Sequence, residues 1–174
     1  YTEEGKNTVV LLKDTTEKER VYPEVDMTIN LGGHTLSTEQ ALALGVLSGN
    51  VIIDGRLSGS SIQNRKTGDN NPRVIAVAAS GNLFINGGTY ECYAENAAQA
   101  AIMSEGDLTV QNAKIIFDGN EGYPTCVSLI SGSNGIISNC KIIATSSTNG
   151  LCRGVHVALG GSVTVSECDI TGIN

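Results

Sequence analysis

Short apolar runs, each followed by a polar or glycine-rich turn, recur along the chain. Within a run, apolar positions alternate with polar ones, as at Leu108 and Val110, which is the two-residue period of a strand with one buried face. Outside residues 96–101, no stretch has the three- and four-residue apolar spacing of a helix. The copies read INLGGHTL, VIIDGRLS, LFINGGTY, LTVQNAKI, GIISNCKI and VTVSECDI, starting at Ile29, Val51, Leu83, Leu108, Gly135 and Val163.

The spacing of these copies predicts how the strands are arranged. The last apolar residue before each turn recurs at intervals of 22 to 32 residues, at Leu31, Ile53, Ile85, Val110, Ile137 and Val165. Two residues further on stand Gly33, Gly55, Gly87, Asn112, Asn139 and Glu167. All but the last are types that tolerate the left-handed backbone of a tight bend. A β-sandwich would not return the same turn residue so regularly, whereas a winding solenoid does.

We therefore predict an all-β fold, a right-handed single-stranded parallel β-helix of about six to seven coils. The chain of 174 residues fits one domain, with residues 1–25 as an N-terminal coil or cap and residues 26–174 as repeating coils. Because the sequence starts at Tyr1 and stops within a strand-like run, we expect it to be part of a longer protein.

Stacked coils bring equivalent residues into vertical files. Asn112 and Asn139 should lie one above the other at the bend, with their amides bonded along the stack. Cys140 and Cys168 should form a second file, read as a column of small buried thiols. The odd count of five cysteines leaves the redox compartment open.

The units INLGGHTL and INGGTY resemble repeats of the pectate lyase-like superfamily of parallel β-helices, and those of bacterial surface and phage tail or fibre proteins. The resemblance covers nearly the whole chain. It implies an extracellular location, on a bacterial surface or a virion. The likeness to phage spikes implies a homotrimer or an assembly with flanking domains. The resemblance implies no single activity, because the superfamily includes lyases, hydrolases, adhesins and inert shafts.

The charge composition limits the classes of molecule that the chain is expected to bind. The net charge of -7, from 11 Lys and Arg against 18 Asp and Glu, disfavours nucleic acid and anionic membranes, so a polysaccharide or a protein fits better. No apolar run is long enough to insert into a membrane. The cysteines lack C-x-x-C pairs and the spacing of a zinc site, so we expect neither a metal site nor a cofactor. Calcium binding is not supported by any cluster of carboxylates in the sequence.

The resemblance to the pectate lyase-like superfamily implies that an active site, where there is one, lies on the first strand of each coil. Its outward residues are expected to be Ala76, Ala101, Ser128 and His156, with Met103 among those that flank them. Glycosidic cleavage uses two carboxyl groups about 5 to 9.5 Å apart, and this strand offers none. His156 alone could serve as a base on this face, but an isolated histidine is more often a surface or packing residue.

The loops that vary in length follow the same point of each coil and should form one edge. Exposed tyrosine rings suit sugar faces, while charged groups bond hydroxyls. The predicted ligand residues are Tyr93, Glu95, Tyr123, Asp69 and Arg73. Weaker catalytic candidates are Asp118 and Glu121 as an acid/base pair, with Arg153 and His156. Solvated loops without a ligand explain the same residues.

Two functional hypotheses follow. The first is a non-catalytic extracellular module for structure or adhesion, with glycan binding as an added role. The alternative is a polysaccharide lyase or glycoside hydrolase acting on a surface or plant polysaccharide, which depends on the resemblance and on Asp118, Glu121 and Arg153.

Overall fold

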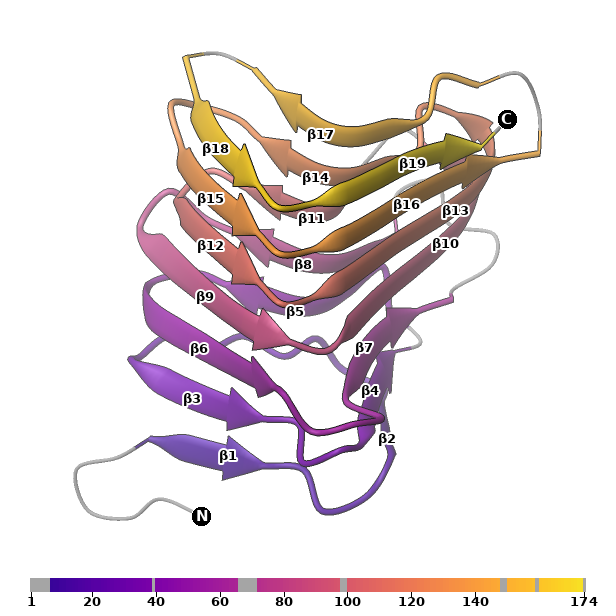
Figure 1. Ribbon diagram of the computed structural model, residues 1–174. Coiled ribbons are helices and arrows are strands. Elements are labelled where there is room, and N and C mark those ends of the chain that lie inside the picture. Colours follow the sequence, from indigo (N-terminus) through magenta and orange to yellow (C-terminus); the bar gives the residue numbers. More distant parts are fainter. Residues whose placement is uncertain are drawn as a thin grey trace.

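The chain is all-β in the computed structural model, which describes residues 7–38, 40–65, 72–97, 100–147, 150–158 and 160–173, without the side chains of 96, 97 and 121. These residues contain strands and turns but no helix. None of this described part is therefore a helix that could cross a membrane. The strands form three parallel sheets that wind together as a solenoid (Figure 1).

Each complete coil contributes one strand to each sheet, and the two terminal coils contribute strands to the first and second sheets alone. The first sheet consists, in spatial order, of β1 (Thr8–Val10), β3 (Met27–Asn30), β6 (Gly49–Gly55), β9 (Gly81–Gly87), β12 (Asp107–Gln111), β15 (Asn134–Ser138) and β18 (Ser162–Ser166). The second consists of β2 (Thr15–Glu17), β4 (Thr35–Thr38), β7 (Ser61–Asn64), β10 (Thr89–Ala97), β13 (Lys114–Gly122), β16 (Lys141–Ser146) and β19 (Asp169–Ile173).

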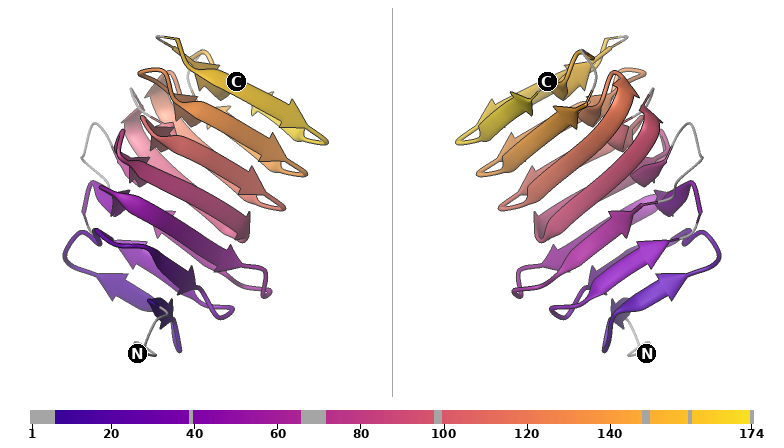
Figure 2. Two further views of the ribbon diagram at one scale, coloured as in Figure 1. Left: turned by 90° about the vertical axis from the view of Figure 1, so that its left-hand side faces the viewer. Right: turned by 90° about the vertical axis from the view of Figure 1, so that its right-hand side faces the viewer.

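The third sheet completes each turn. It consists of β5 (Leu42–Val46), β8 (Arg73–Val77), β11 (Ala100–Ser104), β14 (Thr125–Leu129) and β17 (Arg153–Val157). Its five strands correspond to about five full turns of the solenoid. Figure 2 shows the coils one above another from both flanks.

Files of apolar side chains fill the interior between the sheets. In the first sheet Ile53, Ile85, Val110 and Ile137 are successive partners and are completely buried. Tyr90 and Phe117 are the largest fully buried side chains, both in the second sheet. Each such residue contributes roughly 1.5 to 3 kcal/mol by leaving water. The predicted stacking of coils is therefore confirmed by register and by burial.

The first predicted repeat is wrong by two residues. Ile29, not Leu31, pairs with Ile53, because Leu31 is a buried residue of the bend itself. The next bend differs as well: the left-handed residue is Gly59 (φ 89°) rather than Gly55, since Arg56 to Ser60 lengthen that turn.

The bends of the later coils match the prediction. Asn112, Asn139 and Glu167 all have left-handed backbone, with φ of 57°, 50° and 53°. Asn139 Nδ2 donates to Asn112 Oδ1 (2.7 Å), and Asn112 Nδ2 donates to Asn86 Oδ1 (2.9 Å). The amide ladder thus exists, and it extends one coil further than predicted, to Asn86.

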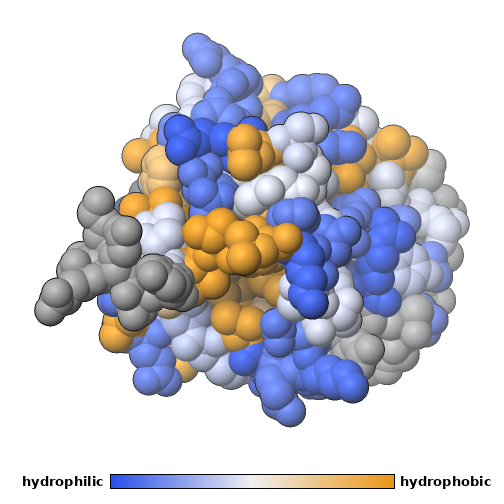
Figure 3. Space-filling model, turned by 90° about the horizontal axis from the view of Figure 1, so that it is seen from below, coloured by the Kyte–Doolittle hydropathy of each residue, from blue (hydrophilic) through white to orange (hydrophobic). Residues whose placement is uncertain are grey.

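The N-terminal end of the solenoid exposes apolar surface, which Figure 3 shows at its centre with hydrophilic residues around it. A hollow of about 220 Å³ lies there, lined by Leu11, Val21, Met27 and Leu36 among others. The strands β1 and β2 therefore leave part of the interior in contact with solvent.

Candidate functional site

A kink stacked through the third sheet shapes its outer face. Side chains of a regular strand alternate between its two faces, but β5, β8, β11 and β14 each contain two consecutive buried side chains. These pairs are Ala43 and Leu44, Val74 and Ile75, Ala101 and Ile102, and Cys126 and Val127. The parallel register omits one residue of each pair, as between Thr125↔Arg153 and Val127↔Val155. Residues on either side of the kink, three apart in sequence, consequently line the same outer surface.

These outer residues form a groove of about 420 Å³, here called the outer groove. One row along the solenoid axis consists of Arg73, Ala100, Thr125 and Arg153. The second row consists of Met103, Ser128 and His156, and the groove is completed by Tyr123 and Ile130. Four residues predicted from the sequence, namely Arg73, Tyr123, Arg153 and His156, are thus brought together.

Arg153 is held over an aromatic ring. Its guanidinium carbon lies 4.8 Å from the centre of the Tyr123 ring, within range of a cation–π contact. Tyr123 is half exposed, and its carbonyl accepts a hydrogen bond from Thr125 Oγ1 (3.0 Å). One face of this ring is therefore taken by Arg153, and the ring orients the guanidinium.

Arg73 lies three coils away at the other end of the same row. Burial lowers the pKa of its guanidinium, while the carboxylate of Glu105 acts in the opposite sense. Arginine nevertheless remains protonated in proteins. The fully buried Asn64 fixes the backbone here, because its Nδ2 donates to the carbonyl of Arg73 (2.8 Å). The groove thus carries one positive charge near each end.

Ser128 and His156 face each other on neighbouring strands. They are register partners in β14 and β17, and Ser128 Oγ lies 3.2 Å from Nδ1 of His156. Ser128 is largely buried, with 9% of its surface exposed, whereas His156 is half-buried. With the ring proton on Nε2, Nδ1 accepts the hydrogen bond of the serine hydroxyl.

Other predicted residues lie elsewhere. Tyr93 and Asp118 are register partners at the end of the second sheet, outside the outer groove. The Tyr93 hydroxyl accepts from Asn120 Nδ2 (3.2 Å), and Asp118 Oδ1 accepts from Thr145 Oγ1 (2.7 Å). Glu95 is exposed on the same strand as Tyr93.

Two predicted residues fall outside the description. Asp69 belongs to the undescribed residues 66–71, and of Glu121 only the backbone, in β13, is described. The proposed pairing of Asp118 with Glu121 therefore stays a prediction.

The prediction that Ala101 points outward is wrong. Ala101 is fully buried, and Met103 takes its place as the partner of Ala76 and Ser128. The reason is a shorter connection after β11, where Ser104 Oγ donates to the Gly106 carbonyl (2.7 Å) and closes the turn two residues early. The outward placement of Ser128 agrees with the sequence analysis, whereas Ala100 and Thr125 are groove residues that it did not name.

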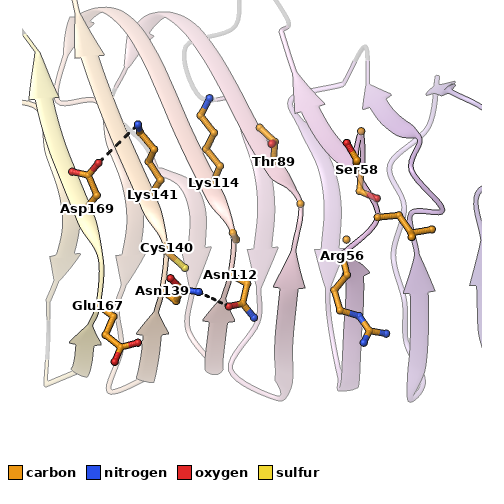
Figure 4. Close-up of a pocket in the computed structure, with 16 residues that line it drawn as sticks. Arg56, Ser58, Thr89, Asn112, Lys114, Asn139, Cys140, Lys141, Glu167 and Asp169 are labelled. Carbon is orange, nitrogen blue, oxygen red and sulfur yellow. Dashed lines mark hydrogen bonds and ion pairs between the residues drawn. The ribbon is translucent and has the colours of Figure 1, made fainter.

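A second furrow, of about 580 Å³, follows the bend between the first and second sheets (Figure 4). Lys114 and Lys141 extend from neighbouring strands, beside the Asn112–Asn139 ladder. Lys141 is 3.9 Å from Asp169, and Glu167 lines the same furrow. The charges of this furrow are therefore mixed. Among the described residues that line the outer groove, the ionisable groups are arginines, a histidine and a tyrosine.

The described residues contain no group of three or more His, Cys, Asp or Glu side chains placed to hold a metal ion. All five cysteines are free thiols. Comparison with known proteins finds no matching family, no curated protein and no solved structure that matches. The geometry of the chain itself is the basis for a functional proposal.

Proposed function

We propose that this chain is a right-handed β-helix of the pectate lyase-like kind, an extracellular module of a bacterial surface or phage appendage, and that it binds an acidic glycan in the outer groove. The observation that carries the proposal is that Arg73 and Arg153 line one groove of a chain whose net charge is -7. Two cations gathered on one face of an acidic protein indicate an anionic ligand.

Guanidinium groups suit the carboxylates or sulfates of an acidic sugar chain. Arginine binds such groups through two parallel hydrogen bonds, which adds geometric specificity to charge. Arg73 and Arg153 belong to β8 and β17, three strand spacings apart, or roughly 14 Å at about 4.8 Å per spacing. A groove of that length accommodates a short run of sugar units along the solenoid axis.

The remaining groove residues support a sugar ligand. Tyr123 is half exposed beside Arg153, and Met103 and Ile130 provide apolar contact for sugar C–H faces. Ser128, Thr125 and His156 offer hydrogen-bonding groups for hydroxyls. This combination of few polar groups on a partly apolar concave surface is typical of small-ligand sites.

Binding is better supported than cleavage of a glycosidic bond. Such cleavage uses two positioned carboxyl groups, and the described residues that line the outer groove include neither Asp nor Glu. Asp118, the described candidate, is instead held by Thr145 on the second sheet. The alternative of a polysaccharide lyase or hydrolase therefore depends on the resemblance.

Titration with soluble polysaccharides tests the proposal. We expect the chain to bind a hexuronate polymer, and to bind a neutral polymer of equal length at least tenfold more weakly. Arg153→Gln should lower affinity for the hexuronate polymer about tenfold or more. Arg56→Gln is the matched control, because Arg56 is exposed, pairs with Asp54 and lies in the other furrow. Equal losses in both variants would show nonspecific charge attraction.

A further inference from the structure

Ser128 and His156 form a pair whose chemistry goes beyond binding. The hydroxyl of a serine is a weak nucleophile until an adjacent base accepts its proton, and the base must lie within hydrogen-bond reach. Ser128 Oγ and His156 Nδ1 are 3.2 Å apart, and both line the outer groove. The register of β14 and β17 holds them opposite each other, so the contact is fixed by the sheet.

We propose that Ser128 is an acyl-accepting nucleophile, with His156 as its base, and that the outer groove hydrolyses short-chain acyl esters on the hydroxyls of an acidic sugar. The sugar part of this substrate rests on the proposed function, whereas the ester chemistry does not. The pair needs no carboxylate, which fits the residues present in the groove.

The reaction balances with water as the only co-reactant. Ser128 Oγ attacks the ester carbonyl carbon while its proton passes to His156 Nδ1, and the bond from that carbon to the sugar oxygen breaks. The sugar oxygen takes the proton from the imidazolium and leaves as a hydroxyl. Water, deprotonated by His156, then attacks the acyl-serine, and serine, carboxylate and one proton are released.

The surroundings of the pair suit both halves of such an ester. Met103 is the register partner of Ser128 on the opposite side from His156, and with Ile130 it offers apolar surface to a methyl or short acyl group. The guanidiniums of Arg73 and Arg153 line the same groove. Positive groups in a partly enclosed site stabilise the negative oxygen that develops on the attacked carbonyl.

A fluorophosphonate probe and peptide mass spectrometry test the nucleophile. The folded chain should acquire one adduct, on Ser128, and this adduct should be absent from Ser128→Ala and from the chain in urea. His156→Gln should lower the labelling rate by about 100-fold or more, the usual contribution of a general base. Ser138→Ala is the matched control, because Ser138 is a half-buried serine in the first sheet. Labelling that is absent from Ser128, or equal in His156→Gln, overturns the proposal.

A second assay separates this inference from glycan binding. With an O-acetylated hexuronate polymer, the wild-type chain should release acetate and Ser128→Ala should release none. The variant should still bind the deacetylated polymer, about two- to tenfold more weakly because it lacks one hydroxyl hydrogen bond, and this binding also shows that the variant folds. Binding without an adduct overturns the esterase inference alone. An adduct without binding overturns the proposed glycan and leaves the nucleophile in place. The absence of both overturns both.

Discussion

The Arg153 guanidinium rests 4.8 Å from the centre of the Tyr123 ring, so an aromatic residue of one coil orients a cation of the next. A partly exposed contact of this kind is worth about 0.5 to 1 kcal/mol. We expect a double-mutant cycle with Arg153→Ala and Tyr123→Leu, read by urea unfolding, to give a coupling energy of that size. Tyr123→Phe should keep the coupling because it keeps the ring face. A coupling energy of zero would show that the contact does not order Arg153.

The tight turn after β11 depends on Gly106. A Cβ at this position would overlap the carbonyl oxygen of Gly81 in the coil below, and backbone cannot move aside cheaply. Gly106→Ala should therefore lower the free energy of unfolding by about 3 kcal/mol or more.

Gly132→Ala is the control for backbone strain. Gly132 has φ 79° and nothing within 4 Å of an added Cβ, so its substitution should cost only about 1 kcal/mol. Urea midpoints of both variants would measure the difference. Equal losses would contradict the steric explanation for Gly106.

The coil period was predictable because the bend demands particular residues. Left-handed backbone is best tolerated by glycine and asparagine, and Gly87, Asn112 and Asn139 each stand two residues after the last apolar position of their runs. The offset between strands was less predictable. A connection closed by a side chain, such as that of Ser104 to Gly106, shortens one coil without changing the apolar pattern around it.

The site could be predicted only in part. Arg73, Tyr123 and Arg153 belong to the variable loops that follow the same point of different coils, and His156 was expected on the outward face of a strand, so their types and places were predictable. The stacked kink was not, because a run such as Val74 with Ile75 fits either face of a strand. Without the kink, Arg153 and His156 would lie on opposite faces of β17, and one groove could not contain both.

Stability at alkaline pH should depend on a buried thiol. Burial raises the pKa of Cys126 to about 12 from a reference value of 9.0. Below pH 9 the thiol is protonated in both folded and unfolded chains. As pH rises above 9 the unfolded chain ionises while the folded one does not, so stability falls by about 1 kcal/mol per pH unit until pH approaches the folded value.

Urea unfolding at pH 8, 9, 10 and 11 measures this slope. Cys126→Ala should make the decline shallower, and the effect of the substitution should therefore shrink as pH rises. Cys168→Ala, at a half-exposed thiol, is the control and should leave the slope close to that of the wild type. A parallel decline in all three chains would place the alkaline sensitivity on other groups.

Glu167 interrupts the amide ladder at a position that suits asparagine better. It has φ 53°, a backbone that costs most residues about 1 to 2 kcal/mol, and it follows Asn139 at the same point of the next coil. Glu167→Asn should stabilise the last described coil by about 1 kcal/mol, because asparagine tolerates this backbone and extends the ladder by one hydrogen bond. Glu167→Gly should relieve only the backbone strain, and Glu167→Ala should relieve neither. Hydrogen exchange at the amides of β18 and β19 measures the local stability of each variant. Slower exchange in the Glu167→Asn variant than in the Glu167→Gly variant would show the contribution of the added ladder hydrogen bond. If Asn and Ala exchange at the same rate, neither the ladder nor the bend limits the stability of this coil.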